Sequence, residues 1–197
     1  MSKGVDKMEM HRIEKFFVNS PIFNYFHNKF LVSKFLKSIQ DNPKNILEIG
    51  CGIGYTTKSL SEKFPNARII AIDYDEEQIK TANRLHENIK NVKFMQGDAT
   101  NLKFKNNSFD AVFEFNTLHH IKNYKKAINE IKMALKKNKN FYIIDVSKYF
   151  FIPIFRSLFP AEAYFTKEGM IKKLAKNNFK IKSHSGKGIF YIVATKK

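Results

Sequence analysis

Residues 46–57 read ILEIGCGIGYTT, and this stretch decides how the rest of the chain is interpreted. An apolar run containing the acidic Glu48 leads into glycines at positions 50, 52 and 54. Glycine tolerates positive φ values and lets a ligand come close to the backbone, so a strand, a glycine-rich turn and a helix in this order are typical of nucleotide-binding folds. The stretch therefore predicts a binding turn between a buried strand and a helix.

Length and composition predict one domain spanning residues 1–197, because 197 residues with 43% hydrophobic content can bury a core. The single cysteine, Cys51, excludes an intramolecular disulfide and a cysteine-based zinc site, which favours a reducing, cytoplasmic setting. Charged residues, asparagine or proline interrupt the most apolar windows, so neither a signal peptide nor a transmembrane helix is expected. Nothing in the sequence indicates a metal requirement, and oligomeric state is not predicted.

A net charge of +17 suits an anionic partner such as RNA or an acidic membrane surface. Only four of the 35 basic residues are arginine, however, although arginine is the side chain suited to bidentate phosphate recognition. Lysine, asparagine, isoleucine and phenylalanine are abundant together, as an A/T-rich genome would produce. Charge alone therefore leaves a nucleic-acid partner open but disfavoured, and peripheral membrane contact stays open.

Short apolar runs alternate with longer amphipathic stretches along the chain, which predicts a mostly parallel sheet with helices on both faces. The expected strands lie near residues 45–49, 68–72, 92–96, 109–115, 139–146, 178–184 and 188–195. Helices are clearest at about 123–137 and at 166–177, where Thr166 is the expected N-cap. The link at 185–188 is short enough for a hairpin, so the last two strands should be antiparallel.

The sequence thus predicts an α/β fold with a Rossmann-like, doubly wound, seven-stranded, mostly parallel sheet, an antiparallel C-terminal hairpin and N-terminal helices. We expect an N-terminal helical lid at residues 1–41 and a cofactor-binding core at 42–146. A substrate-facing segment and the C-terminal hairpin should follow at 147–197. Helical spacing from Glu9 to Ile39, with a break near Pro21, indicates two helices in the first part.

The glycine pattern differs from that of dinucleotide-binding proteins. A G-x-G-x-x-G fingerprint requires glycine where this chain has Tyr55, so the NAD-type pattern is broken. The spacing Glu48-x-Gly50-x-Gly52-x-Gly54 resembles motif I of the class I S-adenosylmethionine-dependent methyltransferases. The resemblance implies that Glu48 helps hold the amino end of the methionine moiety, while the glycine turn with Cys51 passes beneath the cofactor.

Three further segments, between about residues 44 and 146, fall where that family would place them. The resemblance implies that Asp73 binds the ribose hydroxyls, with Tyr74 lying against the adenine. Asp98 would accept a hydrogen bond from the adenine amino group, with the Ala99 backbone close to the ring. Residues 109–121, FDAVFEFNTLHHI, resemble motif IV and place Asn116 at the carboxyl end of the fourth strand, where open α/β sheets bind ligands.

Each of these residues also has an ordinary structural interpretation. A lone aspartate such as Asp73 or Asp98 is often a turn residue or a helix cap. Glycines at a strand-to-helix turn can serve packing alone. We interpret Cys51 as a small residue of the turn and not as a nucleophile, because no base or positive partner stands beside it in the sequence.

Methyl transfer from a sulfonium is an in-line displacement, so holding the acceptor correctly can supply most of the catalysis and a dedicated base is optional. If the acceptor must lose a proton, His119 is the candidate base, because it follows the fourth strand and histidine titrates near neutrality. One of the pair His119 and His120 is expected to face the core. Asp145, near the end of the fifth strand, is a further candidate.

The acceptor is expected to be a small or lipid-like molecule. Amino methylation of nucleic acids is disfavoured, since the family members that perform it carry two prolines and an aromatic after the motif IV Asn or Asp, whereas residues 116–119 read NTLH. The motif resembles instead the branch that methylates small molecules, quinones and lipids. Aromatic residues could form an apolar lid or simply fill a core; they are Phe16, Phe17, Phe23, Tyr25, Phe26, Phe30 and those of 149–165.

Two other classes of function remain open. A protein could bind S-adenosylmethionine without catalysis, as a sensor or an RNA-associated accessory protein. A nucleotide-dependent oxidoreductase would require a preference for NAD over S-adenosylmethionine.

Overall fold

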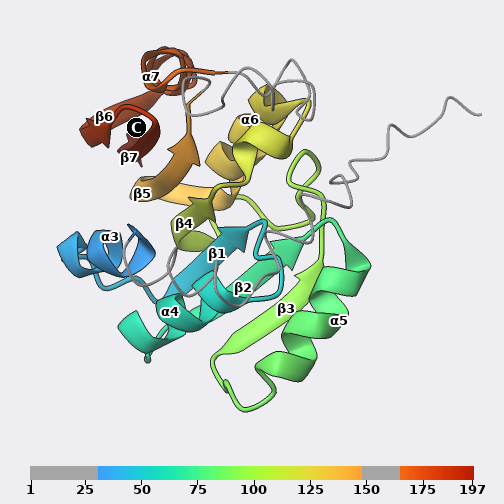
Figure 1. Ribbon diagram of the computed structural model, residues 1–197. Coiled ribbons are helices and arrows are strands. Elements are labelled where there is room, and N and C mark those ends of the chain that lie inside the picture. Colours follow the sequence, from blue (N-terminus) through green and yellow to red (C-terminus); the bar gives the residue numbers. More distant parts are fainter. Residues whose placement is uncertain (1–30, 148–164) are drawn as a thin grey trace, which may run out of the picture.

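The computed structural model describes residues 31–147 and 165–197, and strands from both ranges form one sheet (Figure 1). The strands are β1 (Asn45–Ile49), β2 (Arg68–Asp73), β3 (Val92–Gln96), β4 (Phe109–Phe115), β5 (Leu135–Val146), β6 (Phe179–Gly186) and β7 (Ile189–Lys196). Their order across the sheet is β3-β2-β1-β4-β5-β7-β6. This arrangement confirms the predicted seven-stranded, doubly wound fold.

The order and direction of the strands place the topological switch point of the sheet beside β1. Strands β1 to β5 are parallel, and β7 is antiparallel to both β5 and β6. From β1 the chain winds outward through β2 and β3 and then returns to the other side of β1 at β4. Such a reversal opens a crevice at the carboxyl ends of the strands. The glycine turn that follows β1 therefore lies at the point where this fold binds ligands.

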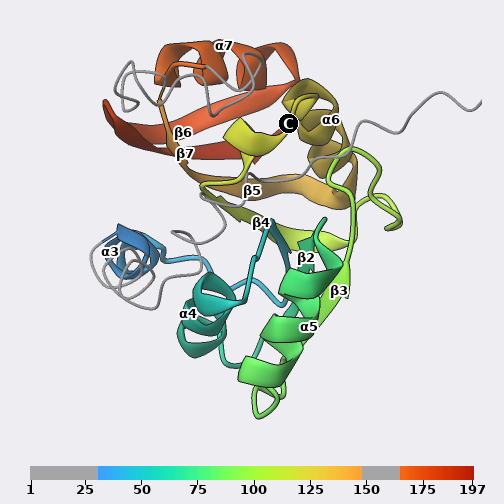
Figure 2. The ribbon, with the colours of Figure 1, turned by 45° about the vertical axis from the view of Figure 1, so that its right-hand side comes forward.

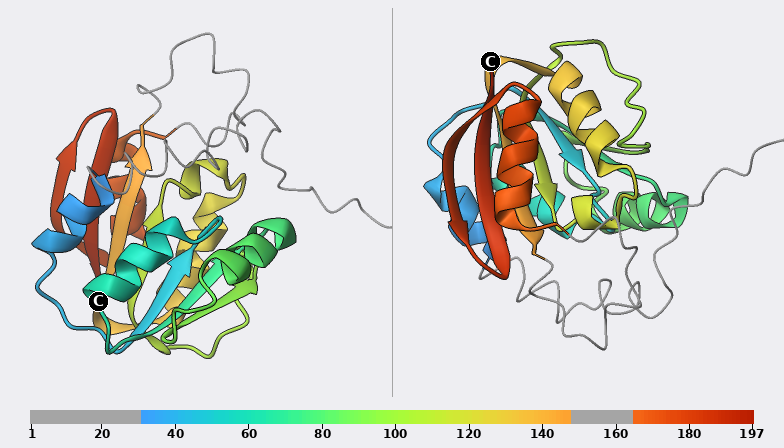
Figure 3. Two further views of the ribbon diagram at one scale, coloured as in Figure 1. Left: turned by 60° about the horizontal axis from the view of Figure 1, so that its bottom comes forward. Right: turned by 90° about the horizontal axis from the view of Figure 1, so that it is seen from above.

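Helices cover both faces of the sheet (Figure 2; Figure 3). They are α3 (Ser33–Ser38), α4 (Tyr55–Lys63), α5 (Glu76–Leu85), α6 (Tyr124–Ala134) and α7 (Lys167–Lys176), with the short 3-10 helix η2 at Leu118–His120. Helices α3, α4 and α5 lie on one face, where Leu36 and Leu60 pack with Phe113 of β4. Helices α6 and α7 lie on the other, where Ile128 and Met170 share a buried cluster.

Helix α6 begins as expected but ends early. The Asn123 side chain accepts a hydrogen bond from the Lys126 N–H at 3.3 Å, which caps the first turn. The prediction of a helix reaching residue 137 is wrong, because Leu135 is the first residue of β5 and pairs with Phe109. Leu135 is fully buried in the strand. Apolar spacing fits a last helical turn and a buried strand start equally well, so the sequence cannot separate them.

The other boundaries lie close to the predicted ones. Strands β6 and β7 form the expected antiparallel hairpin, and the Thr166 hydroxyl accepts a hydrogen bond from the Gly169 N–H at 3.0 Å as the N-cap of α7. Helix α3 is the helix that the described residues show before β1; the expected helices and aromatic residues at 9–30 and 149–164 lie outside the described residues. Within those described, no helix combines the length and apolar character needed to cross a membrane.

Candidate functional site

The glycine turn after β1 has the strand-turn-helix geometry that the sequence predicts. The N–H groups of Gly50 and Cys51 both donate to the Ile72 carbonyl on β2, at 2.8 and 3.0 Å. The φ angles of Gly50, Gly52 and Gly54 are 69°, 53° and 88°. Gly54 is then the N-cap of α4. The turn is thus anchored to β2 and passes directly into a helix N-terminus.

Two of these glycines are required for different reasons. A Cβ at Gly50 would overlap the Thr117 side chain, whose hydroxyl lies 3.3 Å from the Gly50 carbonyl oxygen. Motif IV therefore packs directly on the glycine turn. A Cβ at Gly52 would meet no heavy atom of residues 31–147 and 165–197 within 4 Å. Gly52 thus combines a positive φ with open space on the side where a side chain would stand, as expected of backbone that a ligand covers.

Glu48 is buried in an unusual environment for a carboxyl group. Its side chain is fully inaccessible, and Oε1 accepts a hydrogen bond from the Thr56 hydroxyl at 2.5 Å. Among the described residues, Oε2 has no hydrogen-bond partner. Burial raises the pKa of Glu48 to about 7, and the hydrogen bond from Thr56 compensates for it only in part. A buried acceptor without a partner is costly, and a cationic donor would satisfy it.

Asp73 organises the turn from the end of β2. Its carboxylate accepts hydrogen bonds from the Gly52 N–H at 2.8 Å and from the Asp75 N–H at 2.9 Å. Glu48 and Asp73 thus both lie near the glycine turn, where both raise the pKa of Cys51. Tyr74, next in sequence, is half-buried. These backbone contacts agree with the ordinary interpretation of Asp73 as a turn residue, and its ligand-binding role stays a prediction.

Asp98 follows β3 and has a clear structural role. One of its carboxylate oxygens accepts from the Thr100 N–H at 2.7 Å and from the Thr100 hydroxyl at 2.8 Å, as in a capped turn. Gly97 ties this segment to β2 by donating to the Asp73 carbonyl at 2.9 Å. Ala99 is buried in the core. The segment thus reaches the same sheet edge as Asp73, and Asp98 serves at least as a turn cap.

The motif IV turn is held by a buried carboxyl group that the sequence analysis misses. Asn116 has a positive φ of 53°, and its N–H donates to the Ile144 carbonyl at 2.7 Å. Glu114 Oε2 accepts from the Thr117 and Leu118 N–H groups at 3.0 and 3.4 Å. Burial, and then the nearby Asp145 carboxylate, raise the pKa of Glu114 well above its usual range. The available signal is an acidic residue inside the apolar run FDAVFEF.

His119 is buried and paired with Asp145. Its Nδ1 lies 2.5 Å from Asp145 Oδ1, which also accepts from the Val146 N–H at 2.7 Å. The ring centroids of His119 and His120 are 3.8 Å apart. Burial, and then His119, lower the pKa of His120 well below its usual range. The structure thus brings together two candidate residues, His119 and Asp145, that are 26 positions apart in the chain.

Cys51 is a buried thiol whose pKa is raised well above its usual range, first by burial and then by Glu48 and Asp73. A thiol in this environment is a poor nucleophile. This supports its interpretation as a small residue of the turn. No group of three or more histidine, cysteine, aspartate or glutamate side chains suited to a metal ion occurs within the described residues.

Of the aromatic residues expected in a lid, Phe165 is described, and it belongs to the core. Its ring centroid lies 5.2 Å from that of Tyr124 and 6.1 Å from that of Phe190. The ring is 5% exposed. At this position the ordinary interpretation, an aromatic that fills space beneath helices, is the one observed. The lid itself stays a prediction.

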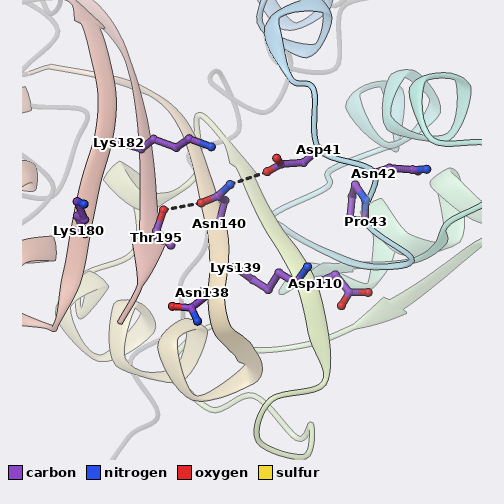
Figure 4. Close-up of a pocket in the computed structure, with 10 residues that line it drawn as sticks. All are labelled: Asp41, Asn42, Pro43, Asp110, Asn138, Lys139, Asn140, Lys180, Lys182 and Thr195. Carbon is purple, nitrogen blue, oxygen red and sulfur yellow. Dashed lines mark hydrogen bonds between the residues drawn. The ribbon is translucent and has the colours of Figure 1, made fainter.

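A separate pocket of about 510 Å³ lies at the opposite edge of the sheet (Figure 4). Asp41 accepts hydrogen bonds there from the Asn140 amide, at 2.5 Å, and from the Tyr142 hydroxyl, and the Thr195 hydroxyl donates to the Asn140 carbonyl oxygen at 2.6 Å. The hydrogen bond from Tyr142, and after it the hydrogen bond from Asn140 and the charges of nearby lysines, lower the pKa of Asp41. This network ties the chain before β1 to β5 and β7.

Comparisons with known proteins agree with this geometry. The chain matches the family described as a methyltransferase domain over residues 40–195. It is 27% identical over 161 residues to a demethylmenaquinone methyltransferase of Staphylococcus carnosus, an alignment that covers 77% of this chain and 66% of that protein. It is 37% identical over 86 residues to a malonyl-[acyl-carrier protein] O-methyltransferase of Bacillus anthracis, which covers 44% and 31%.

A crystal structure of an S-adenosylmethionine-dependent methyltransferase from Aquifex aeolicus shares the fold, with a TM-score of 0.76 and 22% identity over 95% of this chain and 98% of that one. The chain spans less than two thirds of the length of the two curated relatives. The family match nevertheless covers most of this chain and includes the glycine turn, both acidic strand ends and motif IV. The chain therefore belongs to the methyltransferase domain family.

Proposed function

We propose that this protein binds S-adenosylmethionine and transfers its methyl group to a small-molecule or lipid-like acceptor, releasing S-adenosylhomocysteine. The observation that carries the proposal is the buried Glu48 carboxyl group, whose Oε2 has no partner among the described residues. Glu48 lies in β1, the strand that leads into the glycine turn at the carboxyl edge of the sheet. Membership of the methyltransferase domain family supports the same reading.

The residues present fit this cofactor. A cationic amino group would satisfy Glu48 Oε2 and favour the ionised carboxylate, offsetting the cost of its burial. Asp73, at the end of β2, would accept hydrogen bonds from the ribose hydroxyls, because a carboxylate can accept two hydrogen bonds from a diol. Tyr74, Asp98 and Ala99 would surround the adenine, and the glycine turn Gly50-Cys51-Gly52 would pass beneath the cofactor.

The bound cofactor would supply an electrophilic methyl group on a sulfonium. The chain would contribute positioning, because Asn116 and the turn after it stand at the edge of the crevice. His119 is proposed to take a proton from the acceptor where one must be lost. Asp145 would then hold the His119 ring in place through its Nδ1 atom.

The acceptor class is proposed from two sources. The relatives are named for methylation of demethylmenaquinone and of a malonyl group on acyl-carrier protein. Motif IV reads Asn116-Thr117-Leu118-His119 and lacks the prolines of nucleic-acid amino methyltransferases. A small or lipid-like acceptor accommodates both observations. Two competing functions remain. No specific observation favours a non-catalytic S-adenosylmethionine-binding protein. An NAD-dependent enzyme is disfavoured, because the NAD-type glycine pattern requires glycine where this chain has Tyr55.

Calorimetry with S-adenosylhomocysteine and with NAD tests cofactor choice. We expect binding of the former only, and an Asp73→Asn variant should weaken it by about 1–3 kcal/mol, because one carboxylate oxygen becomes an amide donor. Asp75→Asn is the matched control, since asparagine replaces aspartate well as the N-cap of α5. Equal affinity of the Asp73 variant and the wild type would overturn the ribose assignment.

Transfer of labelled methyl into fractionated cell extract then tests catalysis. Label in the organic-soluble or small-molecule pool supports the proposal, and His119→Ala should reduce it without changing affinity for S-adenosylhomocysteine if His119 is the base. Tight cofactor binding without any label would favour the non-catalytic alternative. Label in RNA would contradict the proposed acceptor class.

A further inference from the structure

The positive charge of this chain is concentrated in one part of it. Residues 122–147 and 165–197 contain sixteen lysines, no arginine and three acidic residues. Residues 31–121 contain twelve basic and eleven acidic residues. An A/T-rich genome would raise the lysine content throughout, so it does not account for carboxylates that are scarce in one part only. The distribution points to a surface with an electrostatic role.

Helices α6 and α7 carry six lysines that we call the basic face. They are Lys125, Lys126, Lys132, Lys172, Lys173 and Lys176, all exposed or half-buried. The inner sides of the two helices contribute Ile128 and Met170 to the same buried cluster. Both helices therefore turn their outer sides away from the same face of the sheet (Figure 2; Figure 3).

The three acidic residues of this region do not neutralise the basic face. Asp145 is fully buried beside His119. The Glu130 carboxylate accepts a hydrogen bond from the Leu102 N–H at 3.0 Å. Glu168 is exposed one helical turn before Lys172, but its ion pair, at 3.9 Å, is with Lys167, which is not one of the six lysines. Within residues 31–147 and 165–197, no ion pair joins a lysine of the basic face to a carboxylate.

We propose that the basic face docks this protein on an anionic lipid surface. Lysine is a compact point charge that serves attraction to a diffuse negative surface, whereas bidentate recognition of individual phosphates favours arginine, which the basic face lacks. Single-stranded RNA is commonly held by stacking on exposed aromatic rings, and no Phe or Tyr of the described residues is exposed. The exposed apolar side chain on α6 is Met133, at 49%, next to Lys132. Lysines around an apolar side chain are the pattern of a peripheral membrane contact.

The basic face begins beside the carboxyl edge of the sheet. Helix α6 starts at Tyr124, directly after η2 and His119. A membrane that binds Lys125 and Lys126 would thus lie near the crevice after β1 and β4. This geometry would let an acceptor dissolved in the lipid reach the crevice without crossing water. Docking itself does not depend on the proposed methyl transfer, and the two can be tested separately.

Sedimentation with vesicles tests the docking. We use vesicles of phosphatidylcholine alone and with about 30% phosphatidylglycerol, at about 0.05 M and 0.5 M salt. The full chain should sediment with the anionic vesicles at low salt only. Replacing four lysines by glutamate, at 125, 126, 172 and 176, should weaken this binding at least tenfold. The matched control replaces Lys34, Lys90, Lys93 and Lys103, which are exposed outside the basic face and give the same change in net charge.

Three outcomes would overturn the proposal. One is no preference of the wild type for anionic over neutral vesicles. Another is an equal loss in the two fourfold variants, which would make net charge, and not the basic face, responsible. The third is tighter binding to a generic single-stranded RNA than to the vesicles, lost in the basic-face variant only, which would assign the surface to nucleic acid. Unchanged S-adenosylhomocysteine affinity in both variants shows that they are folded.

Discussion

Replacing Glu48 with glutamine should stabilise the cofactor-free protein at alkaline pH. The folded-state pKa of Glu48 is raised from 4.5 to about 7, because burial disfavours its charge. Below pH 4.5 the carboxyl group is protonated in both states, and its burial carries no ionisation penalty. Between about pH 4.5 and about pH 7, Glu48 ionises in the unfolded chain but not yet in the folded one, so the free energy of unfolding falls. Above about pH 7 Glu48 is ionised in both states, and its effect on the free energy of unfolding stays constant. The rise in the pKa of Glu48 corresponds to a loss of about 3 kcal/mol in the free energy of unfolding.

Urea unfolding of the wild type and Glu48→Gln at pH 5 and pH 8 measures this effect. The stability difference between them should shift by about 2–3 kcal/mol in favour of the variant at pH 8. Saturating S-adenosylhomocysteine should remove much of the shift, because its amino group would compensate the ionised Glu48, and the variant should bind it more weakly. A stability difference that is equal at the two pH values would refute the reasoning, since other titrating groups are common to both proteins.

Two further predictions concern the glycine turn and the turn of motif IV. Gly52→Ala should cost about 1 kcal/mol of stability, because the φ of Gly52 is 53°. It should weaken S-adenosylhomocysteine binding by more than that, since the added methyl group enters the open side of the turn. Calorimetry in which Gly52→Ala loses no more affinity than Gly169→Ala in α7 would contradict this prediction. Glu114→Gln should change the free energy of unfolding by less than about 1 kcal/mol, because burial already disfavours the charged carboxylate and glutamine still accepts from Thr117 and Leu118. Glu114→Ala removes this acceptor and should cost about 1–3 kcal/mol. A large loss for the glutamine variant in urea unfolding would show that Glu114 is ionised.

The sequence predicts the fold well because local pattern and topology agree. Alternating strand and helix signals fix a parallel sheet, and the glycine spacing locates the switch point beside β1. The end of α6 is missed, because Leu135 satisfies a helical stripe and a strand pairing equally. Which one forms depends on Phe109, a residue distant in sequence. Boundaries decided by such tertiary pairing lie beyond what periodicity contains.

For the candidate site, the sequence predicts which residues lie at the carboxyl ends of the strands. It does not predict the hydrogen bonds that these residues make with the backbone and with each other. Asp73 and Asp98 are expected to bind a ligand, and in the structure both first satisfy backbone N–H groups. The pairing of His119 with Asp145 depends on the alignment of β4 with β5, which a linear pattern does not state. An acidic residue inside an apolar strand, as at Glu114, indicates a buried carboxyl group that needs hydrogen-bond donors.

The hydrogen bonds of Asp41 carry a consequence for the order in which the chain folds. Asp41 is joined to Asn140 across 99 positions and to Tyr142 across 101, and Asp110 accepts from the Lys44 and Asn45 N–H groups across 66 and 65. Contacts this distant in sequence cannot form until β4 and β5 have been synthesised. Residues 41–45, which lead into β1, are therefore synthesised early, but their tertiary hydrogen bonds form late. Until then this stretch is exposed to chaperones and proteases. In a chain that stalls before β5, it is expected to be a site of degradation.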